Sequence, residues 1–437
     1  MEFILRCLKN TITVQNTNHS YLFKRLLMIL AKRITLLILT ILIIGACQGE
    51  LQQPSYQFGL NNPAETGSRY PNLYTDESGN IFMSWISSIE EDIYAIEYAM
   101  FNGERWAPSQ TVKLSNNFFV NWADFPSVVG KDGEAVAAHW LRKVEGGPYA
   151  YHVKVAFAGG DERRWQPEIT AHLDGTPTEH GFVSLEPISD DKVLAIWLDG
   201  RETDGRGHGE YENYDQSMTL RSAEISVDGE ITRKRVIDDT VCDCCQTDLV
   251  PVDDGFLAVY RNRSESEIRD IYIAKYRSET GEWSEPKAIH DDGWEMMACP
   301  VNGPRIVSDG NRVAVAWFTM ADNKPAVKLV RSEDGGESFS EPVIVADEYS
   351  TGRADVVLGN NGDIYVSWMA QVEDNGYVMM RKVNRDRELA EPFRVGLTSA
   401  SRQSGFPRME RSGDSILVAW TQTEPLVRVR TAKVDID

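Results

Sequence analysis

The sequence predicts an all-β fold, a single β-propeller of four-stranded blades, with seven blades favoured and six as the alternative. The main observation is a repeated phrase, in which a short strand, a turn with Gly or Asp and an apolar strand with an aromatic residue at its end follow one another. The seven copies end at Trp85, Trp140, Trp197, Tyr260, Trp317, Trp368 and Trp420, at intervals of 55, 57, 63, 57, 51 and 52 residues. A sustained period of about 50 residues is typical of propeller blades. Two stacked β-sandwiches, the competing architecture, do not account for an unbroken period.

Each unit continues with two further β-rich runs, which completes four strands per blade. In the second unit these runs are residues 151–158 and 165–171, and in the fifth unit they are residues 326–332 and 339–346. The seventh unit stops one strand short. Residues 56–60 can supply that outer strand, and the closure removes the exposed sheet edge that an open blade would present. We therefore predict one propeller domain over residues 55–437.

The N-terminal segment has the features of an export signal. Lys32 and Arg33 precede an apolar run over residues 34–44, and Gly45, Ala46 and Cys47 follow it. This pattern is typical of a lipoprotein signal peptide over residues 1–46, in which Met28 can be the true start and Cys47 the lipidated residue. An uncleaved N-terminal anchor is the alternative. In both cases we expect an exported, membrane-anchored protein on the periplasmic side or the cell surface, with residues 47–54 as a short tether.

Charge and composition restrict the class of partner. The chain has 437 residues, of which 42% are hydrophobic and 25% charged, and its formal net charge is −21. Cleavage before Cys47 would make the charge −26, because residues 1–46 contain six basic residues and one acidic residue. An acidic surface repels phosphate backbones, so nucleic acid is not an expected partner. We expect a monomer that meets the membrane only through its lipid.

One turn carries a family resemblance. Residues 332–339, Ser-Glu-Asp-Gly-Gly-Glu-Ser-Phe, have the form S-x-D-x-G-x-x-F, and weaker copies occur at residues 101–106, 159–165 and 278–283. This turn resembles the Asp-box of the sialidase and BNR-repeat superfamily, whose sialidases are six-bladed. The resemblance implies a sialidase-like propeller, a substrate carboxylate held by three arginines, a Tyr/Glu nucleophile pair and an Asp general acid. Candidates for the Tyr of the nucleophile pair are Tyr211 and Tyr214. The candidate for its Glu is Glu267, and the candidate for the general acid is Asp124.

In a propeller, the loops between blades and the loops between second and third strands open on one face, where ligands usually bind. Six arginines of this sequence belong to that face, and we predict that they hold a carboxylate or sulfate group: Arg69, Arg201, Arg261, Arg263, Arg353 and Arg402. Trp122 and Trp294, on the same loops, can stack on a sugar ring. Structural ion pairs and rim packing are the alternatives for these residues.

Four residues of this face are candidates for proton transfer: Asp124, Glu179, His180 and Asp199. Glu179 and Asp199 can form the carboxyl pair that glycoside hydrolysis requires. His180 can instead act as the general base of a polysaccharide lyase, which removes a proton beside a uronate carboxylate. A structural histidine that closes its loop is the alternative for His180.

The four cysteines of the predicted propeller also lie on this face. Cys242, Cys244 and Cys245 fall within four residues, and Cys299 follows in the next loop between blades. In an exported protein they favour two disulfides, with one of the three joined to Cys299 and the other two paired locally. The alternative is a thiolate site for Cu or Zn, with Met296 and Met297 beside Cys299. No Asp-rich calcium loop is present.

The favoured function is cleavage of an acidic glycan, of the sialic-acid or uronate type, at the mouth of the central channel, and it requires no cofactor. The first alternative is a surface propeller that binds glycan or protein without catalysis. The second is a periplasmic propeller that handles metal or redox chemistry through its cysteines.

Overall fold

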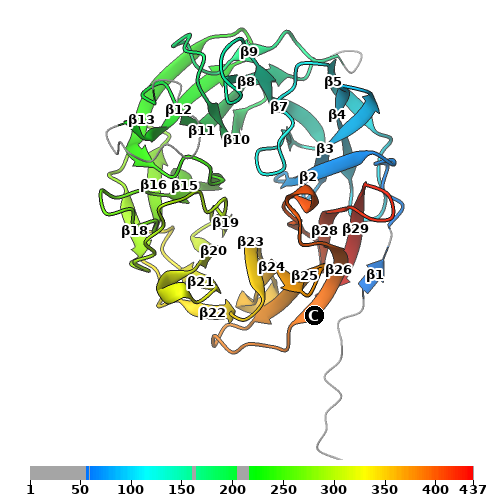
Figure 1. The fold of residues 1–437 in the computed structure, drawn as a ribbon, viewed down its shortest axis with the longest axis vertical. Helices are drawn as coiled ribbons and strands as arrows, with labels where there is room; N and C mark the ends of the chain where they lie inside the picture. Colours follow the sequence, from blue (N-terminus) through cyan, green and yellow to red (C-terminus); the bar gives the residue numbers. More distant parts are fainter. Residues whose placement is uncertain (1–55, 59, 160–163, 204–215, 437) are drawn as a thin grey trace, which may run out of the picture. The chain divides into compact units, whose positions relative to one another are not determined.

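The prediction of seven blades is confirmed. The computed structural model describes residues 56–58, 60–159, 164–203 and 216–436, and these residues form seven antiparallel sheets in a ring (Figure 1). Consecutive innermost strands contact each other around the whole ring, from β2 through β27 and back to β2. Among the described residues no helix has the length and apolar character needed to cross a membrane.

Each blade uses its strands in chain order from the centre outward. The innermost strands are β2 (Ser68–Thr75), β6 (Ser127–Lys131), β10 (His180–Ser189), β14 (Asp248–Val252), β19 (Arg305–Asp309), β23 (Ser350–Leu358) and β27 (Arg408–Ser412). The second strands are β3 (Ile81–Glu90), β7 (Glu134–Lys143), β11 (Lys192–Asp199), β15 (Gly255–Arg261), β20 (Arg312–Thr319), β24 (Ile364–Val372) and β28 (Ser415–Gln422).

The outer half of each blade is less regular. The third strands are β4 (Ile93–Phe101), β8 (Tyr151–Phe157), β12 (Met218–Ser226), β16 (Ile271–Arg277), β21 (Ala326–Ser332), β25 (Asn375–Val383) and β29 (Arg428–Asp435). The outermost strands are β5 (Gln110–Ser115), β9 (Ile169–Thr170), β13 (Ile231–Val241), β17 (Glu282–Trp283) with β18 (Lys287–His290), β22 (Val343–Ala346), β26 (Phe393–Ser399) and β1 (Tyr56–Phe58). Short 3₁₀ turns among the described residues include η2 (Ala321–Asn323), η3 (Asn360–Gly362) and η4 (Arg402–Ser404).

The first and last described segments close the ring. Strand β1 pairs antiparallel with β29, with Tyr56 opposite Val434, and it completes the seventh blade beside β27, β28 and β29. The N-terminal strand therefore supplies the outer edge of the last blade and gives this blade its fourth strand.

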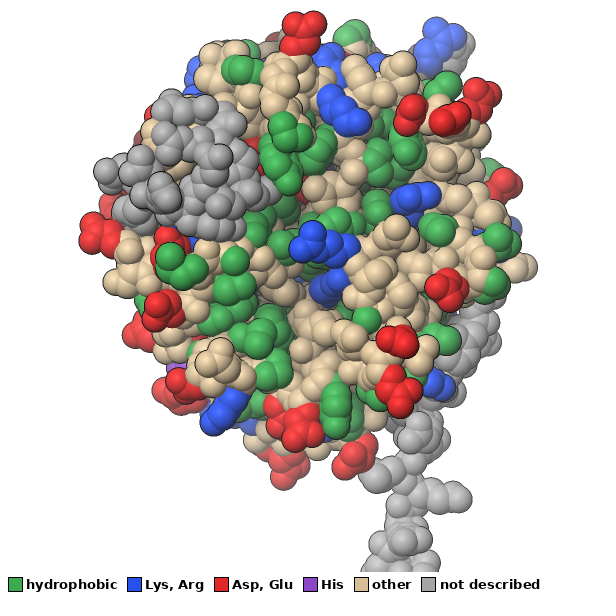
Figure 2. All heavy atoms as spheres, viewed as in Figure 1, with side chains coloured by type: hydrophobic (Ala, Val, Ile, Leu, Met, Phe, Trp, Pro, Cys, Tyr) green, Lys and Arg blue, Asp and Glu red, His purple; other side chains and the backbone are tan. Residues whose placement is uncertain are grey.

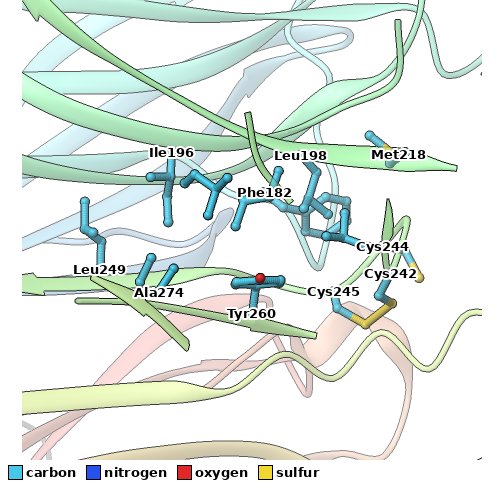
Figure 3. Packing of buried hydrophobic residues seen from close by; sticks show 14 of the residues in the cluster. Phe182, Ile196, Leu198, Met218, Cys242, Cys244, Cys245, Leu249, Tyr260 and Ala274 are labelled. Atoms are coloured by element: carbon cyan, nitrogen blue, oxygen red, sulfur yellow. A yellow bond between two sulfur atoms is a disulfide. The ribbon is translucent and has the colours of Figure 1, made fainter. Parts of the chain in front are cut away.

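Packing between blades explains the repeated aromatic residue. The second strand of each blade is covered on both faces, so it reads as a continuous apolar run that ends near a large buried side chain such as Trp85 or Trp317, both 0% exposed. Between the third and fourth blades, Phe182, Ile196 and Leu198 face Leu249 of β14 and residues of β15 and β16 (Figure 3). Burial of such side chains contributes about 1.5–3 kcal/mol each.

The turn at residues 332–339 is closed by its own side chains. Asp334 accepts a hydrogen bond from the backbone amide of Ser338 (2.9 Å), and the hydroxyl of Ser332 accepts one from the amide of Gly336 (2.9 Å). Gly335 and Gly336 have φ values of 70° and 82°, which favour glycine. The turn joins β21 to β22, so its role here is structural.

Candidate functional site on the face of the loops between blades

The four residues predicted to transfer protons lie in one buried network between the second and third blades. The hydroxyl of Tyr151 donates a hydrogen bond to Oε1 of Glu179 (2.6 Å), and Nδ1 of His180 lies 3.3 Å from the carbonyl oxygen of Tyr151. Nε2 of His180 lies 3.6 Å from Oδ1 of Asp199. Asp124, Glu179, His180 and Asp199 are 3%, 6%, 0% and 0% exposed. The structure thus brings the four together but buries them all.

Asp124 has a structural counterpart, Asn302. Oδ2 of Asp124 accepts the backbone amide of Phe182 (2.8 Å), and Oδ1 of Asn302 accepts the amide of Arg353 (2.7 Å). Phe182 and Arg353 each have a φ of 53° and lie in register shifts at the start of β10 and β23. Because a neutral carboxamide performs the same task in the second case, the position of Asp124 indicates a structural hydrogen bond and not general-acid chemistry.

Asp199 is held in its ionised form. Burial acts to raise its pKa, but hydrogen bonds from Arg201 and Trp197 and the neighbouring charges outweigh burial, and the pKa lies below its usual range. Nε and Nη2 of Arg201 each donate to this carboxylate at 2.7 Å, and Nε1 of Trp197 donates at 2.8 Å. A carboxylate stabilised in this way is a poor proton donor, and Arg201 is correspondingly engaged.

A cluster of three histidines adjoins Asp199. The rings of His172 and His180 are stacked, with centroids 3.6 Å apart, and the ring of His152 meets them edge-on at 4.6 and 5.4 Å. Asp174 contacts Nδ1 of His172 (2.5 Å) and Nε2 of His180 (3.1 Å). The sequence analysis identified only His180 of this group. The available signal was that three of the seven histidines fall between residues 152 and 180.

Two further predicted arginines are engaged inside the protein. The guanidinium of Arg261 donates to the backbone carbonyl oxygens of Asn302, Arg269 and Phe318, and the residue is 1% exposed. Arg263 forms a bidentate ion pair with Glu267, with an Nη2–Oε1 distance of 2.6 Å. Buried guanidinium groups with filled donors hold loops together, so these two arginines are structural.

Glu267 is therefore also accounted for, because it pairs with both Arg263 and Arg269. Trp294 is 5% exposed and lies under the guanidinium of Arg261, 4.9 Å from its ring centroid, so it packs in the interior and offers no sugar platform. Tyr211, Tyr214 and Cys47 lie outside the described residues.

Arg353, Arg402 and Trp122 form a different group, here called the mouth cluster. The guanidinium groups of Arg353 and Arg402 lie over the ring of Trp122, at 4.9 and 5.8 Å from its centroid. The ring of Phe406 also stacks on the indole ring of Trp122, with ring centroids 5.7 Å apart. The loops before β6 and β27 therefore meet across the start of β2 (Figure 1).

The mouth cluster is fixed on one side and open on the other. Arg353 is 8% exposed and donates to the hydroxyl of Ser404 (2.6 Å) and to the carbonyl oxygen of Gly405 (2.8 Å). Burial and the charge of Arg402 lower its pKa to about 10. Arg402 is exposed and Trp122 is half-buried. Within the described part of the chain, neither arginine of the cluster has a carboxylate within ion-pair distance.

Arg69 is half-buried on the same face, and its side chain hydrogen-bonds Tyr70. Its Nε is buried without a partner. The face seen in Figure 2 has Lys and Arg side chains near the centre of the ring, among hydrophobic and uncharged side chains, whereas Asp and Glu side chains lie mostly toward the rim.

The four cysteines form two disulfides, Cys242–Cys245 and Cys244–Cys299, with Cα atoms 5.8 and 6.1 Å apart. Figure 3 shows the cysteines at the end of the core between the third and fourth blades. In this pairing each sulfur atom is bonded to one other sulfur atom. The thiolate metal site considered as an alternative requires free thiolates.

A cavity of about 1080 Å³ lies along the channel, lined by the innermost strands and the turns that follow them, and it was not predicted from the sequence. Arg305 bridges Asp248 (2.9 Å) and Asp355 (3.1 Å) beside it. Burial raises the pKa of Glu410 to about 8, and burial together with the charge of Asp248 raises the pKa of Glu186. The signal was the presence of charged residues within strands that line the ring.

No protein-family model and no curated protein sequence matches this chain. Among solved structures, an ulvan lyase, which represents a new family of polysaccharide lyases, has a TM-score of 0.53 at 11% identity over 85% of this chain and 95% of that chain. A second structure of an ulvan lyase, bound to -[GlcA(1-4)Rha3S]-, has a TM-score of 0.52 at 11% identity, with the same coverage. NanB sialidase from Streptococcus pneumoniae has a TM-score of 0.42 at 13% identity over 86% of this chain and 71% of that chain.

These similarities define the class of fold. The described residues form a seven-bladed β-propeller, and its fold is similar to that of an ulvan lyase over most of both chains. At such low identity the similarity establishes the fold alone.

Proposed function

We propose that this protein binds an acidic glycan at the mouth cluster, with Arg402 and Arg353 on its anionic group and Trp122 against its sugar ring. One observation carries the proposal: two guanidinium groups lie over the same indole ring and have no acidic partner among the described residues. Guanidinium groups bind carboxylate and sulfate through paired hydrogen bonds, which are stronger than neutral ones.

The electrostatics of the cluster support an anionic ligand. The charge of Arg402 disfavours the charge of Arg353, and a bound carboxylate or sulfate would remove that repulsion. The chain as a whole carries −21, so this local excess of positive charge selects a single acidic group over an extended polyanion surface.

The cluster combines one residue held in position by the protein with two residues that are open to a ligand. Arg353 is held by Ser404 and Gly405, so its position is set before a ligand arrives. Arg402 and Trp122 retain exposed surface and would make the direct contacts.

Cleavage of the bound glycan is the second candidate function, and the similarity in fold to an ulvan lyase favours it. Hydrolysis by a carboxyl pair is the less suitable chemistry here, because Glu179 and Asp199 are buried and engaged. Elimination from a uronate needs a base beside a neutralised carboxylate. His152, a half-buried member of the histidine cluster, is a candidate base, whereas Arg201 beside the cluster is paired with Asp199.

Titration calorimetry with oligoglucuronate, 3′-sialyllactose and neutral lactose tests both functions. We expect binding of at least one acidic glycan and none of lactose, with weaker binding as the salt concentration rises. Incubation of the bound glycan, followed by chromatography and ultraviolet absorbance, then reports hydrolysis, elimination or no cleavage. Equal affinity for lactose and the acidic glycans would contradict the proposal.

We also propose that the protein is exported as a monomer and anchored by a lipid on Cys47. The two disulfides support export, because such bonds persist in oxidising compartments. Size-exclusion chromatography of the chain from residue 48 onward tests the monomeric state, and a dimer at micromolar concentration would contradict it.

A further inference from the structure

We propose that His152, His172 and His180 bind one divalent transition-metal ion, with Zn²⁺ as the expected ion. The three residues come from β8, the loop after β9 and the start of β10, and each can offer a ligand nitrogen within 4.8 Å of the other two. This inference does not depend on the glycan site, which lies at the mouth cluster.

Two of the three rings have a nitrogen that makes no hydrogen bond among the described residues, and the first is His152. Its Nε2 lies 3.0 Å from the carbonyl oxygen of Thr176, which only accepts, so Nε2 carries the proton and Nδ1 keeps its lone pair. His180 differs, because its Nδ1 lies 3.1 Å from the carbonyl oxygen of Thr178 and its Nε2 lies 3.1 Å from Oδ2 of Asp174. A metal ion at His180 would take the place of the proton between Nε2 and Asp174. Metal-binding histidines in proteins show this pattern, because the second nitrogen donates to a carbonyl or carboxylate oxygen.

His172 provides the strongest sign of a missing ligand. Its Nδ1 lies 2.5 Å from Oδ1 of Asp174, which fixes the ring and leaves Nε2 as the ligand atom. The side chain is 0% exposed, and Nε2 has no hydrogen-bond partner. A buried nitrogen without a partner is unfavourable, and a metal ion would satisfy it.

Two carboxylates and two guanidinium groups lie around the cluster. Asp174 and Asp199 face His180 at 3.1 and 3.6 Å, and Arg201 pairs with Asp199 (2.7 Å). The side chain of Arg221 approaches Asp199 at 3.8 Å from β12. Asp174 holds His172 and can also enter the coordination sphere as an oxygen ligand.

Binding requires a small rearrangement. With metal–nitrogen bonds of about 2.0–2.1 Å, tetrahedral ligand atoms lie about 3.3 Å apart, so the donors must approach each other by up to about 1.5 Å. The stacked rings of His172 and His180 must also turn, because a metal ion lies in the plane of each imidazole. His152 is half-buried and His172 lies in a loop, so these two rings can make the adjustment.

The test uses the disulfide-bonded chain from residue 48 onward, dialysed against EDTA and shown by thiol titration to contain no free cysteine. Zn²⁺ is titrated by calorimetry, and Co²⁺ by its visible absorption. We expect about one equivalent of each ion and a Co²⁺ spectrum of histidine ligation. His152→Ala and His172→Ala should each weaken Zn²⁺ binding by more than about 100-fold, and Asp174→Asn by about 10–100-fold.

The matched control is His290→Ala, which removes a histidine of β18 in the fourth blade and should leave the affinity unchanged. Melting curves in EDTA show which variants fold. If His172→Ala does not fold, His152→Ala, which changes a half-buried position, provides the test. No binding of Zn²⁺ or Co²⁺, or equal affinity in wild type and His152→Ala, would overturn the proposal. Binding abolished only by thiol alkylation after reduction would place the metal at the cysteines and overturn it equally.

Discussion

Removal of the Cys244–Cys299 disulfide is expected to lower the free energy of unfolding by about 4 kcal/mol. The bond joins residues 55 positions apart, and a cross-link of that length restricts the unfolded chain by about this amount. A domain of about 380 residues has an unfolding entropy of about 0.8 kcal/mol per kelvin, so the expected fall in Tm is about 5 °C.

The variant for this experiment is Cys244→Ala with Cys299→Ala in the chain from residue 48 onward, which leaves no unpaired thiol to exchange with the other bond. Scanning calorimetry at pH 7 measures Tm and the unfolding enthalpy. The matched control is Cys242→Ala with Cys245→Ala. It opens a loop with a separation of only 3, and we expect a loss of about 1.5 kcal/mol and about 2 °C.

The difference between the two double variants is the decisive quantity. Equal losses, or a larger loss from the local pair, would refute the reasoning from loop length and this pairing. Peptide mapping without reduction gives an independent check, and a peptide that links Cys242 to Cys299 would contradict the structure.

Three further predictions follow from individual side chains. Asp124→Asn should change Tm by less than about 1 °C and glycan affinity by less than twofold, because Asn302 accepts the equivalent hydrogen bond with a neutral carboxamide. A tenfold loss of glycan affinity in calorimetric titration would indicate a chemical role for Asp124. The raised pKa of Glu410 means that its ionisation destabilises the folded state as pH rises from 4.5 to about 8. Glu410→Gln should therefore raise Tm at pH 9 and leave it nearly unchanged at pH 4, and the reverse order in scanning calorimetry would contradict this. Cys47→Ala should abolish incorporation of labelled palmitate and release the protein from the membrane fraction, whereas unchanged labelling would exclude lipidation at this residue.

The sequence was sufficient to predict the blades because the same packing environment recurs seven times. Trp85, Trp317 and their counterparts occupy second strands that are covered on both faces, and this burial fixes both residue type and spacing. The face of the loops between blades could also be assigned, because strand direction alone determines it.

The burial of individual side chains on that face could not be predicted. Arg261 and Arg402 both belong to these loops or strand ends, yet Arg261 is buried against three carbonyl oxygens and Arg402 is exposed. The difference depends on whether neighbouring backbone carbonyls lack partners, which the order of residues does not reveal. The pairing of Asp199 with Arg201 is local, but its burial depends on how the second and third blades pack.

The histidine cluster shows a different limit. His152 and His172 meet because β8 and the loop after β9 adjoin β10 of the next blade. Repeat topology implies this proximity, but ring orientation and the orphaned nitrogen of His172 require the coordinates.

The central claim, an acidic-glycan site at the mouth cluster, is tested most directly by the Kd of Arg402→Ala for the tightest-binding acidic oligosaccharide. Loss of a charge-assisted contact of about 1.5–3 kcal/mol predicts a Kd about 10–100-fold higher. Arg402→Lys should retain part of the affinity. Arg277 is an exposed arginine at the other end of the fourth blade, and the control variant Arg277→Ala should bind as tightly as the wild type. A wild-type Kd for Arg402→Ala in a folded protein would contradict the account.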